Sequence, residues 1–311
     1  MGVIMKKENT IQPFQKGDVF VGCTLLNDPD DDHAGDGRII QYDNQLNEKG
    51  VLWVKGTTHL INGLKFGLDG TLWAFDQHNH TSIEIDPNGF QKPIRRFANR
   101  AFSHVNFGGG GLFFGEHLRG DVAPENMGTD LPKIPGTSKF GDGHIFRFDE
   151  GGKLTNEYKT ATHGGMAGFL AVTNSVLTPD ERRIIYLSET GNRVFQFDIV
   201  EDRQLPDLAV FPEGREGFVF YLAYTPDSRL LLSRGRSIAV MDDQTGEISH
   251  EVPLEGFGWA AMCAANDNIH IFVANFFNGE LVKVNLETGV PVASAKTNSE
   301  RALAGVAEYG G

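Results

Sequence analysis

The chain has 311 residues, enough for one large domain or two ordinary ones. Its 41 acidic and 28 basic residues give a net charge of −13, and the basic residues form no patch larger than the pairs Lys6-Lys7 and Arg95-Arg96. This balance repels phosphate backbones and anionic membrane surfaces, so we expect neither nucleic acid nor membrane as a partner. The 38 glycines and 23 phenylalanines favour tight turns between strands that pack on aromatic side chains.

The first ten residues lack the apolar core of a signal peptide, and no apolar run approaches the length of a transmembrane helix. We therefore expect a cytoplasmic protein. The two cysteines are far apart in sequence and cannot form a disulfide framework, so we expect two free thiols.

A repeat of about forty residues runs through the chain. Six short runs of β-forming residues end in the same way, at Asp43, Asp86, Asp149, Asp198, Asp242 and Asn285, with intervals of 43, 63, 49, 44 and 43 residues. Four-stranded blades that stack around an axis have such a period, because a single blade cannot bury both of its faces. The sequence therefore predicts an all-β fold, a six-bladed β-propeller of four-stranded antiparallel blades, as a single domain over residues 1–311 with an N-terminal extension at 1–16.

In chain order, residues 17–22 form a predicted second strand of a blade that has no first strand before it. The next repeat is complete: a strand at 62–67, a turn at 68–70, a strand at 71–75, a strand at 81–85 and a turn at 86–89. Further turns between first and second strands are predicted at 108–111, 178–181, 225–228 and 265–268. The glycine run at 108–111 is a hairpin tip and no phosphate cradle, because no helix follows it.

The last segment, residues 301–311, resembles a first strand with its turn. It would complete the N-terminal blade and close the ring, which removes the open sheet edge at the seam. Two connections between second and third strands are long, at 27–33 and 116–140. In a propeller these connections open on the same face as those between blades, so we expect both insertions to border the mouth of the central channel.

Three histidines occupy equivalent places before the first strands of consecutive blades: His59, His104 and His163. Glu116 and Glu189 stand on neighbouring connections. Histidine suits both metal binding and proton transfer, because its pKa is near neutral and its neutral ring is a good ligand. We therefore predict His59, His104, His163 and Glu116 as catalytic residues, with His59, His104, His163 and Glu189 as ligands of one divalent ion (Zn, Mn, Ca or Fe). The alternative is that these histidines make structural hydrogen bonds. No nucleotide or organic cofactor is expected.

The other half of the predicted mouth is aromatic. Core packing explains some of these side chains, but their number at strand entrances favours the binding of an apolar, aromatic small molecule. An arginine there could hold a carboxylate or phenolate. The predicted substrate-binding residues are Asn62, Phe220, Tyr221, Arg234, Trp259, Phe276 and Phe277.

At residues 62–76 and 177–198 the chain resembles the SMP-30/gluconolactonase-like superfamily of six-bladed propellers. The resemblance implies a metal-dependent lactone or ester hydrolase, and it places Asn62 at the substrate-side asparagine of that family. The family's metal ligands, an asparagine, an aspartate and a glutamate, fall at Thr173, Phe220 and Ala304. The resemblance therefore implies the scaffold, with histidines in place of the usual ligands or with a different chemistry.

The leading functional hypothesis is an enzyme that acts on an apolar, aromatic small molecule, most simply a lactone or ester hydrolase. A lyase, an isomerase or an oxygenase with histidine-bound iron could use the same site. The second class of hypothesis is a non-catalytic propeller that serves as a binding platform. The oligomeric state is left open.

Overall fold

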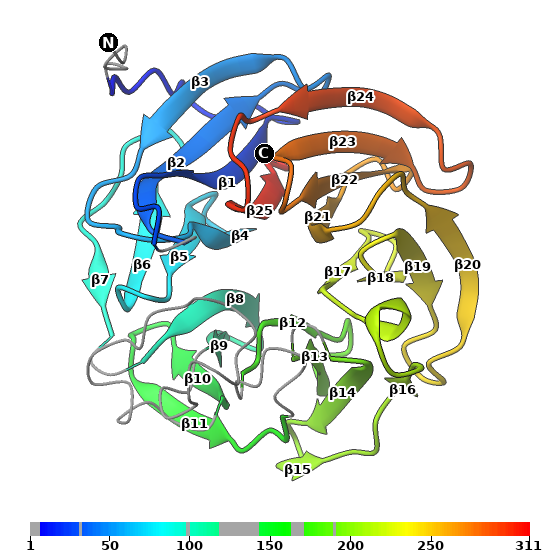
Figure 1. The fold of residues 1–311 in the computed structure, drawn as a ribbon. Coiled ribbons are helices and arrows are strands. Elements are labelled where there is room, and N and C mark those ends of the chain that lie inside the picture. Colours follow the sequence, from blue (N-terminus) through cyan, green and yellow to red (C-terminus); the bar gives the residue numbers. More distant parts are fainter. Residues whose placement is uncertain (1–6, 31–32, 98–99, 118–142, 163–170, 189–190) are drawn as a thin grey trace.

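The computed structural model describes residues 7–30, 33–97, 100–117, 143–162, 171–188 and 191–311. These residues form six antiparallel sheets that surround a central channel as the blades of a propeller (Figure 1), so the predicted fold class is confirmed. The first three blades are β25 (Leu303–Glu308), β1 (Val19–Leu26), β2 (Gly35–Tyr42) and β3 (Glu48–Trp53); β4 (Asn62–Phe66), β5 (Leu72–Asp76), β6 (Thr81–Ile85) and β7 (Arg95–Arg96); and β8 (Phe102–Gly108), β9 (Gly111–Glu116), β10 (Ile145–Asp149) and β11 (Leu154–Tyr158).

The other three blades follow the same order from the channel outward. They are β12 (Asn174–Leu177), β13 (Arg183–Leu187), β14 (Arg193–Asp198) and β15 (Arg203–Gln204); β17 (Tyr221–Tyr224), β18 (Leu230–Ser233), β19 (Ser237–Met241) and β20 (Ile248–Pro253); and β21 (Trp259–Ala264), β22 (His270–Asn275), β23 (Glu280–Asn285) and β24 (Pro291–Lys296). The fourth blade has one addition, because the short strand β16 (Ala209–Val210) also pairs with β14.

The ring closes as predicted, through the C-terminal strand. β25 is the innermost strand of the first blade and pairs antiparallel with β1, from Val19 opposite Glu308 to Cys23 opposite Leu303. Figure 1 shows the red C-terminal strand beside the blue N-terminal blade. Leu303 and Val306 of this strand are buried in the core that the first and last blades share. The seam of the ring is therefore held by both backbone pairing and apolar packing.

The recurring aspartate or asparagine has one structural role in all six blades. After the third strand its side-chain oxygen accepts backbone N–H groups of the turn that leads to the fourth strand. In the fifth blade, Asp242 Oδ1 accepts from Gln244 N at 2.9 Å and Thr245 N at 2.7 Å. Equivalent bonds are made by Asp43, Asp86, Asp149, Asp198 and Asn285. A short polar side chain stabilises such turns, which explains why the sequence repeat ends at this residue.

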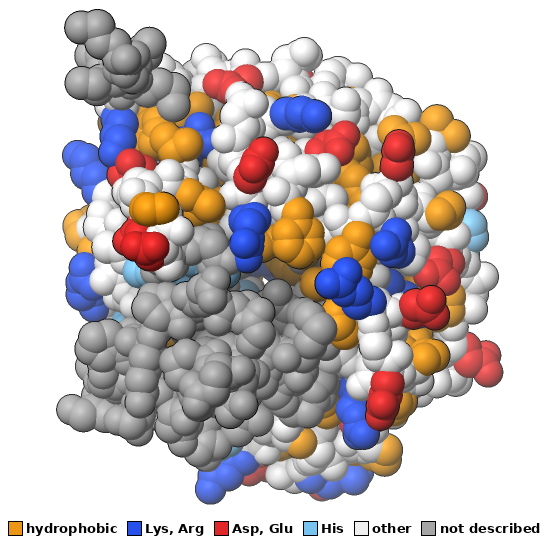
Figure 2. All heavy atoms as spheres, in the orientation of Figure 1, with side chains coloured by type: hydrophobic (Ala, Val, Ile, Leu, Met, Phe, Trp, Pro, Cys, Tyr) orange, Lys and Arg blue, Asp and Glu red, His pale blue; other side chains and the backbone are white. Residues whose placement is uncertain are grey.

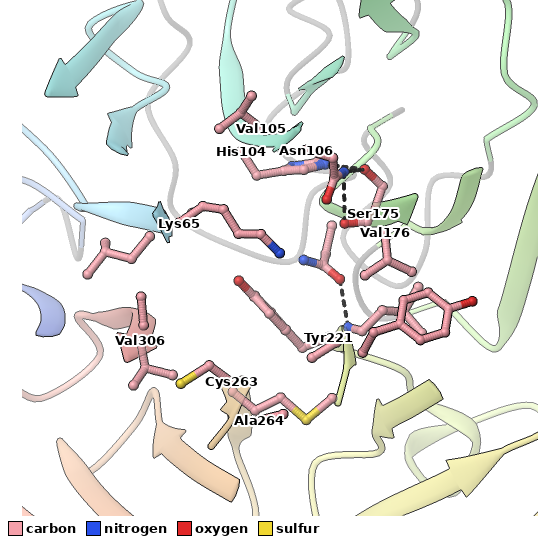
Figure 3. A pocket seen from close by; sticks show the side chains of 18 of the residues that line it. Lys65, His104, Val105, Asn106, Ser175, Val176, Tyr221, Cys263, Ala264 and Val306 are labelled. Atoms are coloured by element: carbon pink, nitrogen blue, oxygen red, sulfur yellow. Dashed lines mark hydrogen bonds between the residues drawn. The ribbon is translucent and has the colours of Figure 1, made fainter. Parts of the chain in front are cut away.

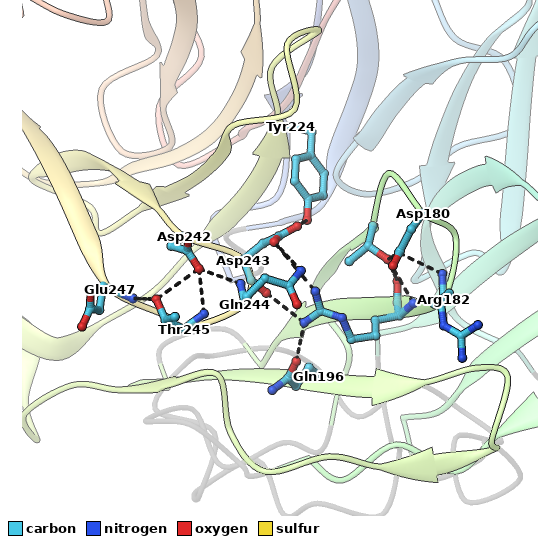
Figure 4. Close-up of polar contacts among 11 residues, drawn as sticks. Asp180, Arg182, Gln196, Tyr224, Asp242, Asp243, Gln244, Thr245 and Glu247 are labelled. Carbon is cyan, nitrogen blue, oxygen red and sulfur yellow. Dashed lines mark hydrogen bonds and ion pairs between the residues drawn. The ribbon is translucent and has the colours of Figure 1, made fainter.

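The fifth blade also contacts the fourth through polar groups of these turns (Figure 4). The Tyr224 hydroxyl donates to Asp243 Oδ2 at 2.6 Å. The Arg183 guanidinium donates to Gln196 Oε1 at 2.7 Å and to the Asp243 carbonyl at 2.8 Å. These bonds link β13, β14 and β17 to the turn after β19, so they fix the two blades relative to each other.

The predicted turns between first and second strands are present. In the third blade, Gly109 and Gly110 have φ of 55° and 66°, and they join Gly108 to Gly111 in a hairpin. The turns of the last three blades place Glu181, Ser228 and Asn268 in the left-handed region, each closed by a backbone bond three residues back. The glycine run is therefore a hairpin tip, as its sequence predicts.

Apolar side chains fill the space between neighbouring blades. Between the second and third blades the core is aromatic, with Trp73, Phe75, Phe102, Phe114 and Phe146 buried together. Phe102 lies 5.1 Å from Phe114 and 5.5 Å from Phe146, measured between ring centroids. The many phenylalanines of the sequence thus serve mainly as packing between sheets.

The segment before β1 lies against the first blade. Thr10 N donates to the Val51 carbonyl at 2.8 Å, and the Phe14 ring lies 4.4 Å from the Phe20 ring. Within the part of the chain that the structure describes, no helix has the length and apolar character needed to span a membrane.

Candidate functional site at the channel mouth

The strand directions determine which connections share a face. In each antiparallel blade the second and fourth strands run the same way, so the connections that follow them lie on one face of the ring. We call this face, at the central axis, the mouth. Four histidines lie on connections of this face. His59 follows β3, His78 follows β5, His33 stands two residues before β2, and His117 directly follows β9. In the view down the ring axis, hydrophobic and basic side chains adjoin the centre of the molecule, with histidine side chains beside them (Figure 2).

The His59 and His78 rings stack on each other. Their centroids are 4.4 Å apart and the planes differ by 12°. His59 is half-buried, and its Nδ1 lies 2.7 Å from the Thr58 hydroxyl, which fixes the ring orientation. His78 is buried, and neither of its ring nitrogens has a hydrogen-bond partner. Burial lowers the pKa of His78 well below its usual range, and the neighbouring histidines lower it further. His78 is therefore a neutral ring at neutral pH.

A buried carboxylate holds the backbone of this pair. Asp76, at the end of β5, accepts from Thr58 N at 2.7 Å, His59 N at 3.2 Å and Asn79 N at 3.0 Å. It therefore connects the loop that carries His59 to the loop that carries His78. Burial raises the pKa of Asp76, although these hydrogen bonds act in the opposite direction.

Two further histidines extend the pair. His33 lies 6.0 Å from His78 and 6.1 Å from Phe276, measured between ring centroids. His117 is buried, and burial together with the nearby His33 lowers its pKa to about 4. We call His33, His59, His78 and His117 the histidine cluster. Two of its rings, His78 and His117, are neutral at neutral pH, because burial and the neighbouring histidines lower their pKa values.

The aromatic side of the mouth begins where the histidine cluster ends. Phe276 lies 5.4 Å from Phe277, Phe277 lies 6.1 Å from Phe257 and stacks on it, and Phe257 lies 5.7 Å from Phe220. Phe277 is 45% exposed, whereas Phe220 is buried. The Arg236 guanidinium lies over the Phe257 ring at 5.4 Å. We call these four phenylalanines the aromatic row; it is continuous with the histidine cluster through the His33–Phe276 contact.

His104 is not part of the histidine cluster. It lies within β8, which begins two residues before it, and its ring is enclosed between β9 and β12. Its Nε2 lies 2.7 Å from Ser175 Oγ and its Nδ1 lies 2.9 Å from Ser103 Oγ. A Cβ on Gly115 would stand 2.0 Å from the His104 ring, so this position requires glycine. Burial lowers the pKa of His104 to about 3, and the ring is neutral.

Glu116 ends β9 and is completely buried. Its carboxylate pairs with Arg100 at 2.9 Å and accepts from Gly143 N at 3.1 Å. Glu116 therefore holds the backbone just before β10. His163 and Glu189 lie outside the described residues. Among the residues that the structure describes, no group of three His, Cys, Asp or Glu side chains is arranged to hold a metal ion.

The structure does not bring all seven predicted substrate-binding residues together. Phe220, Phe276 and Phe277 belong to the aromatic row, whereas Tyr221 lines the channel below the mouth. Asn62 starts β4, and its Nδ2 donates to Gln77 Oε1 at 2.5 Å.

Two others are engaged in structural contacts. Arg234 pairs with Glu251 at 3.2 Å and stacks over Phe211. Trp259 is 3% exposed and donates from Nε1 to the Glu255 carbonyl at 2.9 Å.

No family model matches the sequence, and no curated protein matches it. Several solved structures share its fold at low sequence identity. The structure from a nidogen/laminin complex has a TM-score of 0.63 and 11% identity, and the match covers 93% of this chain and 97% of that one. A streptogramin B lyase structure has a TM-score of 0.56 and 13% identity, with 93% and 91% covered. Virginiamycin B lyase from Staphylococcus aureus has a TM-score of 0.52 and 12% identity, with 78% and 71% covered.

At such identities the similarity establishes the fold only. The protein is a six-bladed β-propeller with a histidine cluster and an aromatic row at its mouth. Propellers of this kind include enzymes as well as a component of a protein complex, so the function has to be argued from the site.

Proposed function

We propose that the protein is an enzyme that cleaves the ester bond of an apolar, aromatic ester or lactone at the channel mouth, with His59 as the general base. The observation that carries this proposal is the continuity between the histidine cluster and the aromatic row, through His33 and Phe276 at 6.1 Å. A substrate whose ring packs on the phenylalanines places its polar end beside the histidines. The SMP-30-like resemblance at residues 62–76 agrees with ester chemistry.

The surroundings of His59 suit a base. The Thr58 hydroxyl orients its ring, and Asp76 anchors the backbone that carries it. In a hydrolysis, His59 takes a proton from water while the water oxygen bonds to the ester carbonyl carbon. The resulting tetrahedral species collapses with loss of the alkoxy group, which takes the proton back from His59. The stacked His78 stays neutral, so it does not repel the imidazolium that His59 becomes.

Elimination is the second candidate, favoured by the names of two structural neighbours, virginiamycin B lyase and streptogramin B lyase. In this reaction His59 takes a proton from a carbon next to the C–O bond, a double bond forms and the carboxylate leaves. The two reactions are separated by products formed in ¹⁸O-labelled water. Hydrolysis introduces one solvent oxygen into the acid, whereas elimination introduces none and gives an alkene.

Replacing His59 by glutamine removes the base while keeping a polar side chain of similar size. We expect kcat/KM for a turned-over aromatic ester to fall by about 10²–10⁴-fold, the usual contribution of general base catalysis. His78→Phe keeps a buried aromatic ring under His59 and should change kcat/KM only a few-fold. The matched control is His270→Gln, because His270 pairs with Asp267 on a turn at the opposite face. Unchanged turnover in His59→Gln would refute the assigned role of His59.

Binding to the aromatic row can be measured independently of turnover. Aromatic esters and lactones should raise the melting temperature by mass action, whereas sugar lactones should not, because they match an apolar surface poorly. Phe277→Ala should weaken aromatic binding by about 1–2 kcal/mol, roughly ten-fold, since the ring is 45% exposed in the free protein and is covered by the ligand.

Phe90→Ala is the control for this measurement, because Phe90 is 72% exposed on an outer turn of the second blade. Stabilisation by sugar lactones alone would contradict the substrate class. Binding of aromatic esters without any turnover, in the wild-type protein, would instead favour the platform hypothesis.

A further inference from the structure

Below the mouth, the channel contains a cavity of about 190 Å³. All six innermost strands contribute to its lining, which includes Lys65, Asn106, Asn174, Tyr221, Cys263 and Val306. Liquid water occupies about 30 Å³ per molecule, so the cavity has room for roughly six waters or for a small organic molecule. Figure 3 shows Lys65 of β4 and Tyr221 of β17 extending from opposite sides toward the middle of the channel.

Lys65 has an unusual position for a lysine. Its side chain is exposed to the channel, and within the described part of the chain no hydrogen bond or ion pair fixes its ammonium group. The six innermost strands surround this narrow space, so burial lowers the pKa of Lys65. A cation that is enclosed without a partner costs free energy, and an anion beside it would offset that cost.

The other polar groups of the cavity do not supply this anion. Glu308 also borders the cavity, but its carboxylate accepts from Asn266 N at 2.6 Å and from Asn44 Nδ2 at 3.2 Å. Burial raises the pKa of the Cys263 thiol and that of the Tyr221 hydroxyl, so both stay protonated and neutral. A neutral hydroxyl can donate a hydrogen bond to an anion. Lys65 and Tyr221 therefore present donors to the same space.

The rest of the lining decides what kind of anion fits. Small side chains border most of the remaining space, because Ala223, Cys263 and Ala264 are half-buried at the cavity, whereas the larger aliphatic side chains of these strands are buried between the blades. Two donors, the Lys65 ammonium and the Tyr221 hydroxyl, match the two oxygens of a carboxylate, and the small side chains beside them leave room for a short hydrocarbon chain. Phosphate or sulfate suits the cavity less well, because all of its oxygens would need partners.

We propose that this cavity is a binding site for a small aliphatic monocarboxylate, whose carboxylate pairs with Lys65 and accepts from Tyr221. The site is separate from the histidine cluster, and nothing in the proposed ester cleavage requires it. Lys65 is a binding residue, and its loss is expected to leave turnover at the mouth unchanged.

The test is thermal unfolding of the wild-type protein in sodium formate, acetate, propionate and butyrate, against sodium chloride at equal ionic strength. We expect a saturable rise in melting temperature with the carboxylates, larger for propionate than for formate, as mass action requires. In Lys65→Met, which has a similar length and no charge, the carboxylate-dependent rise should disappear. Without added carboxylate this variant should be at least as stable as the wild type, because an enclosed, unpaired charge is removed.

Lys55→Met is the matched control, since Lys55 is exposed on the surface and the substitution changes the net charge equally. It should keep the full response to propionate. Tyr221→Phe should weaken the response and retain part of it, because it removes the hydroxyl and keeps the ring. An equal response in Lys65→Met and the wild type, no saturable response in the wild type, or a larger response to phosphate than to propionate would each overturn the proposal.

Discussion

A chain that lacks residues 301–311 is expected to lose its cooperative thermal unfolding transition, as measured by circular dichroism and calorimetry. This deletion removes β25, so β1 loses its inner partner along the whole register from Val19 to Cys23. Leu303 and Val306 leave the core, at about 1.5–3 kcal/mol each for the lost burial. The first and last blades then expose apolar faces to the channel. These losses together approach the 5–15 kcal/mol by which domains are typically stable.

Two further chains make the interpretation specific. Deleting only residues 310–311 leaves β25 intact, because both glycines are exposed and follow the strand, and this chain should melt as the wild type does. A rearranged chain can restore β25. It begins at residue 298, joins residue 311 directly to residue 17 and ends at residue 297, so β25 comes before β1 as the first strand does in the other blades. This chain should fold. A deletion of 301–311 that melts cooperatively at the wild-type temperature would contradict closure of the ring by this strand.

Acidification from pH 6.5 to 4 is expected to destabilise the protein steeply. His104 and His117 have folded-state pKa values of about 3 and 4, below the value of about 6.5 in the unfolded chain. In this window the unfolded state binds more protons, so stability rises with pH and falls as pH is lowered. At pH 5 each of these histidines reduces the free energy of unfolding by about 2 kcal/mol relative to pH 7.5. Above pH 6.5 both states are neutral and the effect vanishes.

Other buried groups modify this dependence in a known direction. The lowered pKa of His78 adds to the destabilisation. The raised pKa values of Asp76 and Glu308 oppose it, because these carboxyl groups take up protons more readily in the folded state. Urea unfolding at a series of pH values measures the net slope.

In that experiment His117→Gln should reduce the slope below pH 6 by about one proton. The control is His250→Gln, at an exposed position of β20, which should leave the slope unchanged. A free energy of unfolding that is constant between pH 6.5 and 4 would contradict the burial of these rings as neutral bases.

The fold could be predicted because its turns depend on residues that are close together in the sequence. An aspartate or asparagine closes the turn after each third strand, and the hydrogen bonds of Asp242 to Gln244 and Thr245 give the physical reason. The same local signals place the hairpins at 108–111 and 225–228. Closure by the last strand could be predicted because the N-terminal blade lacks a first strand and the C-terminal segment supplies an additional one.

The site could be predicted only in part, because strand position alone does not determine where a side chain points. His59, Phe276 and Phe277 are at the mouth, as the alignment of the blades indicates. The same alignment places His78 and His117 after second strands, where the structure has them, but their contact with His33 is made by an irregular loop. His104 lies two residues inside β8 and not before it, and this is enough to bury its ring against Ser175.

The sequence by itself therefore determined the blades, their number and the seam, because turns and strand alternation depend on residues close together in the chain. Only the tertiary structure decided which polar groups meet. The His59–His78 stack joins connections from two different blades, and Lys65 and Tyr221 enter one cavity from strands more than 150 residues apart. Such contacts depend on the packing of blades around the axis, and a bulge or a one-residue shift in strand entry changes the face to which a side chain belongs.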